Sequence, residues 1–397
     1  MALEIRPPAN RRELIEAAKA IGPIHHGHDP EAGAHRFVKY YHDFPNATPE
    51  DTRLAYRDGT LVGGLRVARY DLRVGRAAVS MGGLSWVSTL EKYRMEGYGA
   101  ELVGDAVDYI GSCGCDVSLL FGISDFYHRF GYAPAMSGQG VVVNTKDACR
   151  AKQYCSVRRF APRDAEAAIR CFNRNNADRT GTCVRKRAYW PWYRQSFAKA
   201  RVVEGPRKRM LGYFIAGPAK SVYSVRELVL TPRVEVYETV LAWLGQRAKA
   251  NHAERIRFEM PTDHHFATYS RDYGVLFESR YTRAGGGMMR IMDVASLLRK
   301  IEPELRRRAV SSGQRFTFGR IEFRTDIGTA SVCLAERTRG SVTVRIDQNM
   351  LIRAIMGRDS FQELRQTGRA RVPARAVPEL DVLFPKHIAH VWSLDGF

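Results

Sequence analysis

The chain has 397 residues, of which 45% are hydrophobic and 26% charged, and this composition is typical of a soluble globular protein with two or three domains. No run of about 18 apolar residues exists, which excludes a membrane-spanning helix of the usual kind. The first residues also lack the apolar segment of a secretory signal peptide, so we expect the protein in the cytoplasm.

The formal net charge of +20 at pH 7 raises nucleic acid as a partner, because a basic surface attracts phosphates. The basic residues are instead spread over the chain in short clusters, at 185–187, 207–209 and 306–308. None of these clusters accompanies a recognisable nucleic-acid-binding motif. We therefore expect solvated basic faces and no nucleic-acid partner, and keep a nucleic-acid-associated protein only as a third hypothesis.

A first helix is predicted over residues 10–21, where Leu14 and Ile21 belong to a set of apolar residues at helical spacing. A loop is expected from there to about residue 45. The His-rich stretch between His25 and His28 lies in this loop without a matching carboxylate motif, so no metal is expected there.

Four aromatic residues of the same loop admit two interpretations. They line a pocket for an acceptor substrate, or they form a local hydrophobic cluster under the loop. The four residues are Phe37, Tyr40, Tyr41 and Phe44.

Two alternating segments follow, residues 53–57 and 60–72, joined by Asp58-Gly59. Alternation on both sides of a tight turn predicts an antiparallel hairpin. The hairpin leads into residues 84–89, an apolar stretch of β-favouring residues that predicts a buried strand.

A turn with two glycines and an arginine comes next, Arg94-Met95-Glu96-Gly97-Tyr98-Gly99, and a helix is predicted over residues 100–110. Such a turn directs backbone N–H groups and the positive end of a helix dipole at one point, and its glycines let a ligand approach the main chain. Arg94 adds a cation that can hold a pyrophosphate through two hydrogen bonds. The turn predicts a phosphate site, although an ordinary strand-to-helix turn fits the pattern equally well.

Another buried strand is predicted at residues 117–121, and Phe126-Tyr127-His128-Arg129-Phe130-Gly131-Tyr132 follows it. The whole stretch from residue 84 to residue 132 resembles the Gcn5-related N-acetyltransferases (GNAT). In that family a splayed strand, an Arg/Gln-x-x-Gly-x-Gly/Ala turn and a later Phe-Tyr-x-x-x-Gly-Phe/Tyr segment build the acetyl-coenzyme A site. Glu91 departs from the pattern, since the family often has proline there.

The seven cysteines are an odd number scattered over a long chain, which predicts free thiols rather than a disulfide framework. Cys113-Gly114-Cys115 lacks a second cysteine pair for a zinc site, and buried packing is the better interpretation.

Beyond residue 144 the order of predicted elements repeats, and we interpret this as a second, degenerate acetyltransferase fold. Arg233 to Glu238 follows its central strand in place of a glycine-bearing phosphate turn, so no coenzyme is expected there. The elements are a strand at 157–160, a helix at 164–175, strands near 210–216 and 225–230, and a helix at 236–250.

After Gly285-Gly286-Gly287 a third unit is predicted, with a strand and a helix in residues 288–305 and three alternating strands between 316 and 346. Helices at 348–356 and 360–365 follow, and the arrangement resembles the sterol carrier protein fold. Alternation over residues 387–394 predicts a packed strand near the end of the chain.

Two acetyltransferase folds followed by a sterol-carrier-like domain resemble the layout of the enhanced intracellular survival (Eis) family of N-acetyltransferases, over essentially the whole chain. The expected fold is mixed α and β, with an acetyl-coenzyme A-binding GNAT domain at 1–150. A degenerate GNAT-like domain at 151–287 and a sterol carrier protein-like domain at 288–397 follow. The resemblance also implies a homo-oligomer, with a hexamer as one form.

The resemblance further implies the residues of the site. In the family a tyrosine after the fifth strand is the general acid and the carboxylate of the C-terminal residue is the base, and the matching residues are Tyr127 and Phe397. Asp395 would help to hold a cationic acceptor. The residues expected to bind acetyl-coenzyme A are Val87, Ser88, Thr89, Arg94, Met95, Glu96, Gly97, Tyr98, Gly99 and Ser124.

The leading hypothesis is therefore an acetyl-coenzyme A-dependent N-acetyltransferase that needs no metal and transfers the acetyl group directly in a ternary complex. Its acceptors would be amino groups of cationic small molecules, such as aminoglycosides or polyamines, or of lysine side chains. A non-catalytic scaffold that binds a lipid or another ligand with the same domains is the alternative.

Overall fold

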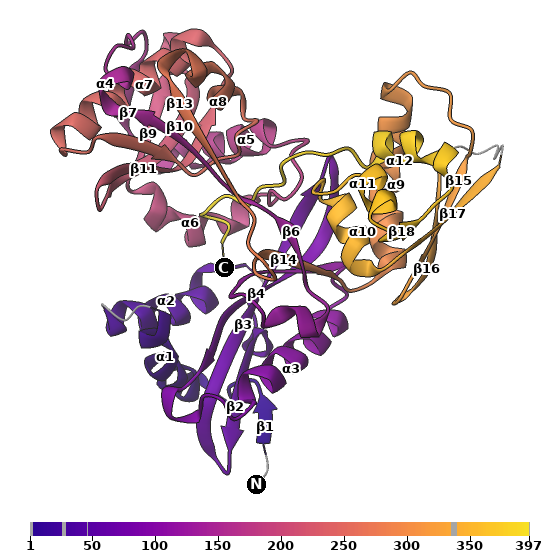
Figure 1. Ribbon diagram of the computed structural model, residues 1–397. Coiled ribbons are helices and arrows are strands. Elements are labelled where there is room, and N and C mark those ends of the chain that lie inside the picture. Colours follow the sequence, from indigo (N-terminus) through magenta and orange to yellow (C-terminus); the bar gives the residue numbers. More distant parts are fainter. Residues whose placement is uncertain (1–2, 26–28, 46, 335–339, 397) are drawn as a thin grey trace. The chain divides into compact units, whose positions relative to one another are not determined.

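The computed structural model describes residues 3–25, 29–45, 47–334 and 340–396 of the chain. These residues form two compact units. Unit 1 consists of Met1–Ala135 with Thr282–His387, and unit 2 consists of Met136–Tyr281 with residues 388–396. Figure 1 traces the chain from its indigo N-terminus to its yellow C-terminal segment.

The large sheet of unit 1 has seven strands in the order β1-β2-β3-β4-β5-β14-β6. Its first four strands are antiparallel neighbours, whereas β4 and β5 are parallel and are connected through a helix. The strands are β1 Leu3–Arg6, β2 Thr52–Arg57, β3 Thr60–Val74, β4 Ala77–Thr89, β5 Val117–Gly122, β14 Gly286–Ile291 and β6 Ala133–Met136.

Helices cover both faces of this sheet (Figure 1). The pair α1 Arg11–His25 and α2 Pro30–Asp43 packs with Leu54 on one face, and α3 Tyr98–Ser112 packs with Ala55 on the other. Successive side chains of a strand point to opposite faces of the sheet. A continuous apolar run in a strand therefore packs against the helices on both faces.

The helix α2 corrects the expectation of a loop up to residue 45. Asp29 caps this helix by accepting a hydrogen bond from the backbone N–H of Ala32. The aromatic side chains of α2 form the local hydrophobic cluster that was the second interpretation, since Phe37, Tyr40 and Phe44 are buried and the Tyr40 and Phe44 rings stack at 4.7 Å.

Unit 2 repeats the plan of the first sheet, in the order β13-β7-β12-β11-β10-β9-β8. Its β11 and β12 are parallel and are connected by α7 Val234–Ala250, as β4 and β5 are by α3. Further helices are α4 Thr145–Ala148, α5 Ala165–Asn175, α6 Trp190–Phe197 and α8 His265–Tyr269. The strands are β7 Gly138–Asn144, β8 Ser156–Arg159, β9 Ala200–Glu204, β10 Met210–Ala219, β11 Val222–Leu230, β12 Arg255–Phe258 and β13 Val275–Arg280.

Two strands join sheets that lie far from them in sequence. β7 follows the strands β1–β6 in the chain but pairs with β12 and β13 in unit 2. β14 follows the strands of unit 2 in the chain but pairs with β5 in unit 1. The units therefore differ from the division expected at residues 150 and 287, because strand pairing crosses both of those limits.

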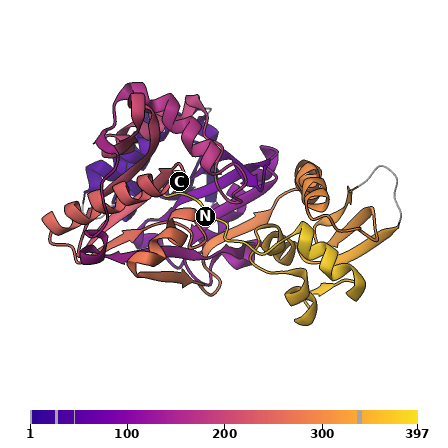
Figure 2. The same cartoon turned by 90° about the horizontal axis from the view of Figure 1, so that it is seen from above.

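The rest of unit 1 is a four-stranded sheet in the order β16-β15-β17-β18, with helices on one side of it (Figures 1 and 2). β15 and β17 are parallel, and β16 and β18 are antiparallel to their neighbours. The elements are α9 Val294–Ser311, β15 Arg320–Thr325, β16 Gly328–Cys333, β17 Ser341–Ile346, α10 Gln348–Ile355, α11 Phe361–Gln366, β18 Ala370–Arg371 and α12 Val377–Leu383.

The end of the chain is packed into unit 2 without forming a strand, which corrects the strand expected at residues 387–394. Trp392 is 1% exposed, and its indole Nε1–H donates to Asn176 Oδ1 at 3.0 Å. The backbone N–H of His390 donates to Thr180 O, which lies in a loop. Because a loop offers no continuous row of partners, the segment is buried without a strand ladder.

A buried ion network fixes this segment. The Arg185 side chain, 1% exposed, donates to both carboxylate oxygens of Glu227 at 2.8 and 2.7 Å and to both of Asp395 at 2.9 and 3.0 Å. The Tyr193 hydroxyl also donates to Asp395, at 2.7 Å. Charges in such a place are tolerated only when their hydrogen bonds are satisfied, and here they are.

Replacement of this arginine, Arg185→Met, is expected to lower the free energy of unfolding of unit 2 by about 3–5 kcal/mol, because two buried carboxylates lose their counter-charge. Urea unfolding followed by tryptophan fluorescence measures it, since only Trp86 of the five tryptophans lies outside unit 2. The control Arg170→Met removes an exposed (i, i+4) pair with Glu166 and should cost at most about 0.5 kcal/mol. Equal effects of the two changes would contradict the network's role.

Candidate active site

The strands β4 and β5 separate at their C-terminal ends. Over the described residues their parallel pairing runs from Met81 with Val117 to Leu84 with Leu120 and goes no further. β5 continues to pair with β14 as far as Gly122, so β4 is the strand that turns away. The last residues of β4 therefore have one open edge within the sheet.

A bulge in β4 explains the separation. Two residues, Trp86 and Val87, stand opposite the single residue Leu65 of β3, and Trp86 has a left-handed φ of 56°. An extra residue of this kind bends a strand and increases its twist. The sequence pattern predicted the strand but not the bulge, since nothing about a tryptophan marks a positive φ.

Backbone donors of β4 face the open edge. Leu90 N–H donates to Val62 O on β3, at 2.9 Å. Because N–H groups along a strand alternate between its two edges, the N–H groups of Thr89 and Val87 point to the β5 side, where the strands have separated. Such donors can polarise a carbonyl oxygen placed in the gap.

The predicted glycine turn lies directly after this edge and starts α3. Gly97 is the N-cap of the helix with φ 91°, and among the described residues this helix start has no side-chain cap. No atom of the described residues lies within 4 Å of the position that a Cβ of Gly97 would occupy. The helix thus presents free backbone donors and its positive dipole end in an open place, as an anion site requires.

Some side chains of this turn are bonded to the sheet, and others are exposed to solvent. Glu96 and Tyr98 are held by Arg57 of β2, which donates to the Glu96 carboxylate at 2.7 Å and to the Tyr98 hydroxyl at 3.1 Å. Arg94 and Met95 are exposed. The turn is thereby anchored to the sheet, and the exposed Arg94 guanidinium can bind a ligand. No sequence pattern predicted the role of Arg57.

Close packing joins the helix start to the aromatic segment after β5. A Cβ on Gly99 would lie 3.1 Å from Thr89 Oγ1 and 3.7 Å from the Phe126 ring. Phe126 in turn meets Tyr127 edge-on, with ring centroids 4.9 Å apart. The strand edge, the turn and Tyr127 therefore belong to one packed cluster.

Tyr127 has a buried ring and an accessible hydroxyl. The ring lies against Gly122, where a Cβ would come within 2.5 Å of it, and the residue is 8% exposed. Its Oη has no hydrogen-bond partner among the described residues, and it is not among their fully enclosed polar atoms. Burial raises the pKa of Tyr127 to about 12, so the phenol remains protonated throughout the neutral range.

Other predicted site residues have different surroundings. The Ser88 hydroxyl is buried and bonded to His25 Nε2 at 2.8 Å and to Trp86 O, so only the main chain of Ser88 remains for a ligand. Ser124 is exposed in the turn after β5. The prediction that Asp395 holds an acceptor needs correction, since its carboxylate is buried and bonded to Arg185 and Tyr193. Phe397 lies outside the described residues.

The described part of the chain holds no group of three His, Cys, Asp or Glu side chains placed to bind a metal ion, and His26 and His28 lie outside that part. All seven cysteines are free thiols. None of the helices in the described ranges combines the length and apolar character that a bilayer crossing needs.

An open strand edge beside a helix start without a side-chain cap, with a tyrosine on the following segment, is the arrangement expected of a GNAT acyl-transfer site. Residues 10–135 match the family model of the acetyltransferase (GNAT) domain, so this part of the chain is such a domain, and the expected enzyme class is confirmed. Comparison with curated proteins gives no match.

Solved structures extend the likeness to the whole chain. A probable N-acyltransferase from Enterococcus faecalis superposes with a TM-score of 0.77 at 14% identity, over 100% of both chains. A GCN5-related N-acetyltransferase from Anabaena variabilis gives 0.75 at 13% identity, also over 100% of both. Eis1 from Mycobacterium abscessus gives 0.66 at 18% identity, over 99% of this chain and 100% of that one. The predicted mixed fold with GNAT-like sheets is thus confirmed.

Proposed function

We propose that the protein is an acetyl-coenzyme A-dependent N-acetyltransferase of the Eis type, acting on amino groups of cationic small molecules or of lysine side chains. The observation that carries the proposal is the open edge of β4 directly beside the uncapped start of α3. The first can hold a thioester carbonyl and the second a pyrophosphate. The likeness to Eis1 supports the more specific part of the proposal.

In this proposal the coenzyme pyrophosphate lies on the N–H groups of the turn from Arg94 to Gly99, with the Arg94 guanidinium beside it. The Arg57 charge compensates Glu96, whose carboxylate would otherwise repel the phosphates. The thioester oxygen accepts hydrogen bonds from the N–H groups of Val87 or Thr89. A separate covalent enzyme intermediate is not required.

The reaction needs one base and one acid. A primary amine has a pKa of about 10, so a base must take a proton before the amine attacks the thioester carbon. The tetrahedral intermediate then collapses, the C–S bond breaks, and the coenzyme A thiolate takes a proton from the Tyr127 hydroxyl. The α-carboxylate of Phe397 is the proposed base.

This choice of base follows from the resemblance to the Eis family, in which the carboxylate of the C-terminal residue is the base. The described part of the chain ends one residue before Phe397, and within it Arg185 and Tyr193 hold the Asp395 side chain.

One coenzyme site per chain is proposed, because in unit 2 the C-terminal segment occupies the position that corresponds to the open edge of β4. The pairing of β11 with β12 ends at Val225 and Phe258, in the same way that the pairing of β4 with β5 ends at Leu84 and Leu120. The C-terminal segment lies along β11 beyond that point, where Ser393 Oγ donates to Arg226 O at 3.1 Å.

We also propose a homo-oligomer, for which a monomer in light scattering would be the contrary result.

The variant Gly97→Val is expected to weaken acetyl-coenzyme A binding by roughly one to two orders of magnitude, since a φ of 91° costs a β-branched residue about 1–3 kcal/mol and the turn must change shape. Calorimetry should give one site per chain for the wild type. Gly104→Val is the control, because that helical glycine has open space around it and no positive φ. Unchanged affinity for acetyl-coenzyme A in Gly97→Val would show that the coenzyme does not bind at this turn.

A further inference from the structure

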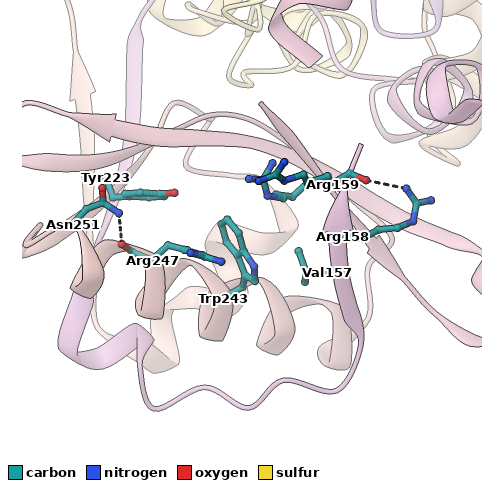
Figure 3. Close-up of a pocket in the computed structure, with 8 residues that line it drawn as sticks. Val157, Arg158, Arg159, Tyr223, Trp243, Arg247 and Asn251 are labelled. Atoms are coloured by element: carbon teal, nitrogen blue, oxygen red, sulfur yellow. Dashed lines mark hydrogen bonds between the residues drawn. The ribbon is translucent and has the colours of Figure 1, made fainter. Parts of the chain in front are cut away.

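Unit 2 contains a cavity of about 330 Å³ that the proposed acetyl transfer does not use. It lies between the strands β8, β9 and β11 and the C-terminal half of α7, and Figure 3 shows its lining. Its charged residues are all arginines, and its rings are Tyr223 and Trp243. The volume lies at the lower end of the range of about 300–1,000 Å³ for small-molecule pockets.

Three guanidinium groups converge on this cavity. Arg201 and Arg247 lie over the Trp243 ring, 5.6 and 5.2 Å from its centroid, and the cation–π contacts hold both side chains in place. Burial lowers the pKa of Arg201, and the positive charges of Arg159 and Arg247 lower it further, so both neighbouring charges act on the Arg201 guanidinium.

No carboxylate lines the cavity to balance them. The nearby carboxylates of Asp164 and Glu204 are bonded to Arg158 at 2.7 and 2.9 Å, and Figure 3 shows the Arg158 guanidinium directed away from Trp243. Within the described ranges, Arg159, Arg201 and Arg247 have no ion pair with an acidic side chain. The Arg201 guanidinium donates only to backbone carbonyls, those of Lys199 and Ala200.

Ordinary structural roles account for only part of this arrangement. Arg247 lies in the last turn of α7, where a cation stabilises the helix dipole. Arg159 and Arg201 belong to strands and have no such role, although their mutual repulsion with Arg247 opposes folding. An anion bound among the three would remove that repulsion and accept several charge-assisted hydrogen bonds.

We propose that this cavity is a binding site for a small molecule that carries at least two phosphate groups. Guanidinium groups match phosphate oxygens in pairs, and three of them in a compact cavity exceed what a single monoanion needs. The site is distinct from the position in unit 2 that corresponds to the coenzyme turn, because that position is at the N-terminal end of α7, near Arg233, and the cavity is at the C-terminal end.

The test uses the full chain and inorganic pyrophosphate, titrated by calorimetry with and without saturating coenzyme A. With coenzyme A present, one saturable pyrophosphate site per chain is expected. The double variant Arg201→Gln/Arg247→Gln should weaken this binding by at least about tenfold, since each lost charge-assisted hydrogen bond corresponds to about that factor. Its thermal unfolding temperature should be no lower than that of the wild type, since repulsion among the arginines is reduced, and its acetyl transfer should match the wild type. Together these results exclude a folding defect.

Arg233→Gln is the matched control, because it removes one exposed arginine from the other end of α7. It should leave pyrophosphate binding unchanged. Absence of saturable binding, or equal affinity of the double variant and the wild type, would overturn the proposal. So would an equal loss in Arg233→Gln, which would indicate general charge attraction, and so would binding of duplex DNA that depends on Arg201 and Arg247 in preference to pyrophosphate.

Discussion

Removal of Phe397, or addition of a few residues after it, is expected to lower acetyl transfer to a good amine acceptor by about 10²–10⁴-fold, the usual cost of losing a positioned acid or base. The reason is chemical. In the proposed mechanism the α-carboxylate of Phe397 is the base, and an extended chain would have an amide at that position instead. Steady-state thiol release measures the change, while coenzyme binding should stay nearly unaltered.

Phe397→Ala is the informative companion, because it keeps the α-carboxylate and removes only the ring. Its turnover should fall less than that of the deletion. If the C-terminally extended protein turns over as fast as the wild type, the base lies elsewhere, and a water molecule held by the first domain becomes the better candidate.

Tyr127→Phe is expected to lower kcat by a comparable factor, about 10²–10⁴, with little change in the affinity for acetyl-coenzyme A. In the proposed mechanism the lost hydroxyl acts only when the thiolate leaves, so its removal affects the transition state and not the ground state. Single-turnover kinetics, with the coenzyme affinity measured separately, distinguish these effects.

Tyr132→Phe is the control for Tyr127. The Tyr132 hydroxyl is buried and bonded to Ser118 Oγ at 2.7 Å, so its loss should lower stability and leave turnover largely intact. Equal losses of kcat in the two variants, or wild-type kcat in Tyr127→Phe, would show that Tyr127 contributes only to packing and is not the general acid.

The raised pKa of Tyr127 also fixes the pH dependence. A general acid works in its protonated form, which Tyr127 keeps at every pH below its pKa of about 12. The rate should therefore rise with pH as the amine loses its proton, with no decline from the tyrosine below that value. A decline in kcat near pH 10 that is absent in Tyr127→Phe would show an ordinary, exposed phenol.

The sequence predicted those parts of the site that depend on local pattern. Residues 84–89 and 117–121 are apolar runs long enough for buried strands, and the glycines at 97 and 99 mark a helix start that needs a positive φ and close approach. The bulge at Trp86 was not predicted, because it arises from pairing with β3 and leaves no mark on the strand's own pattern.

Helix α2 shows a different kind of failure. Asp29, Pro30 and Glu31 form a helix-start signal, and Phe37, Tyr40, Tyr41 and Phe44 recur at helical spacing, so the signal was present but was outweighed by the surrounding His and Gly residues. The strand expected at residues 387–394 failed for a physical reason. A strand needs a continuous row of backbone partners, and the backbone N–H groups of His387 and His390 instead donate to Gly357 and Thr180, which lie in turns. The exchange of β7 and β14 between sheets depends on long-range pairing that no local pattern specifies.

The most direct test of the whole account is thiol release from acetyl-coenzyme A with a panel of amines, comprising an aminoglycoside, a polyamine and a lysine-containing peptide, with mass spectrometry of the acceptor. The account predicts acceptor-dependent release, a product heavier by one acetyl group on nitrogen, and loss of both in Tyr127→Phe. Tight coenzyme binding with no acetylated product from any amine of the panel would contradict it and would favour a binding scaffold.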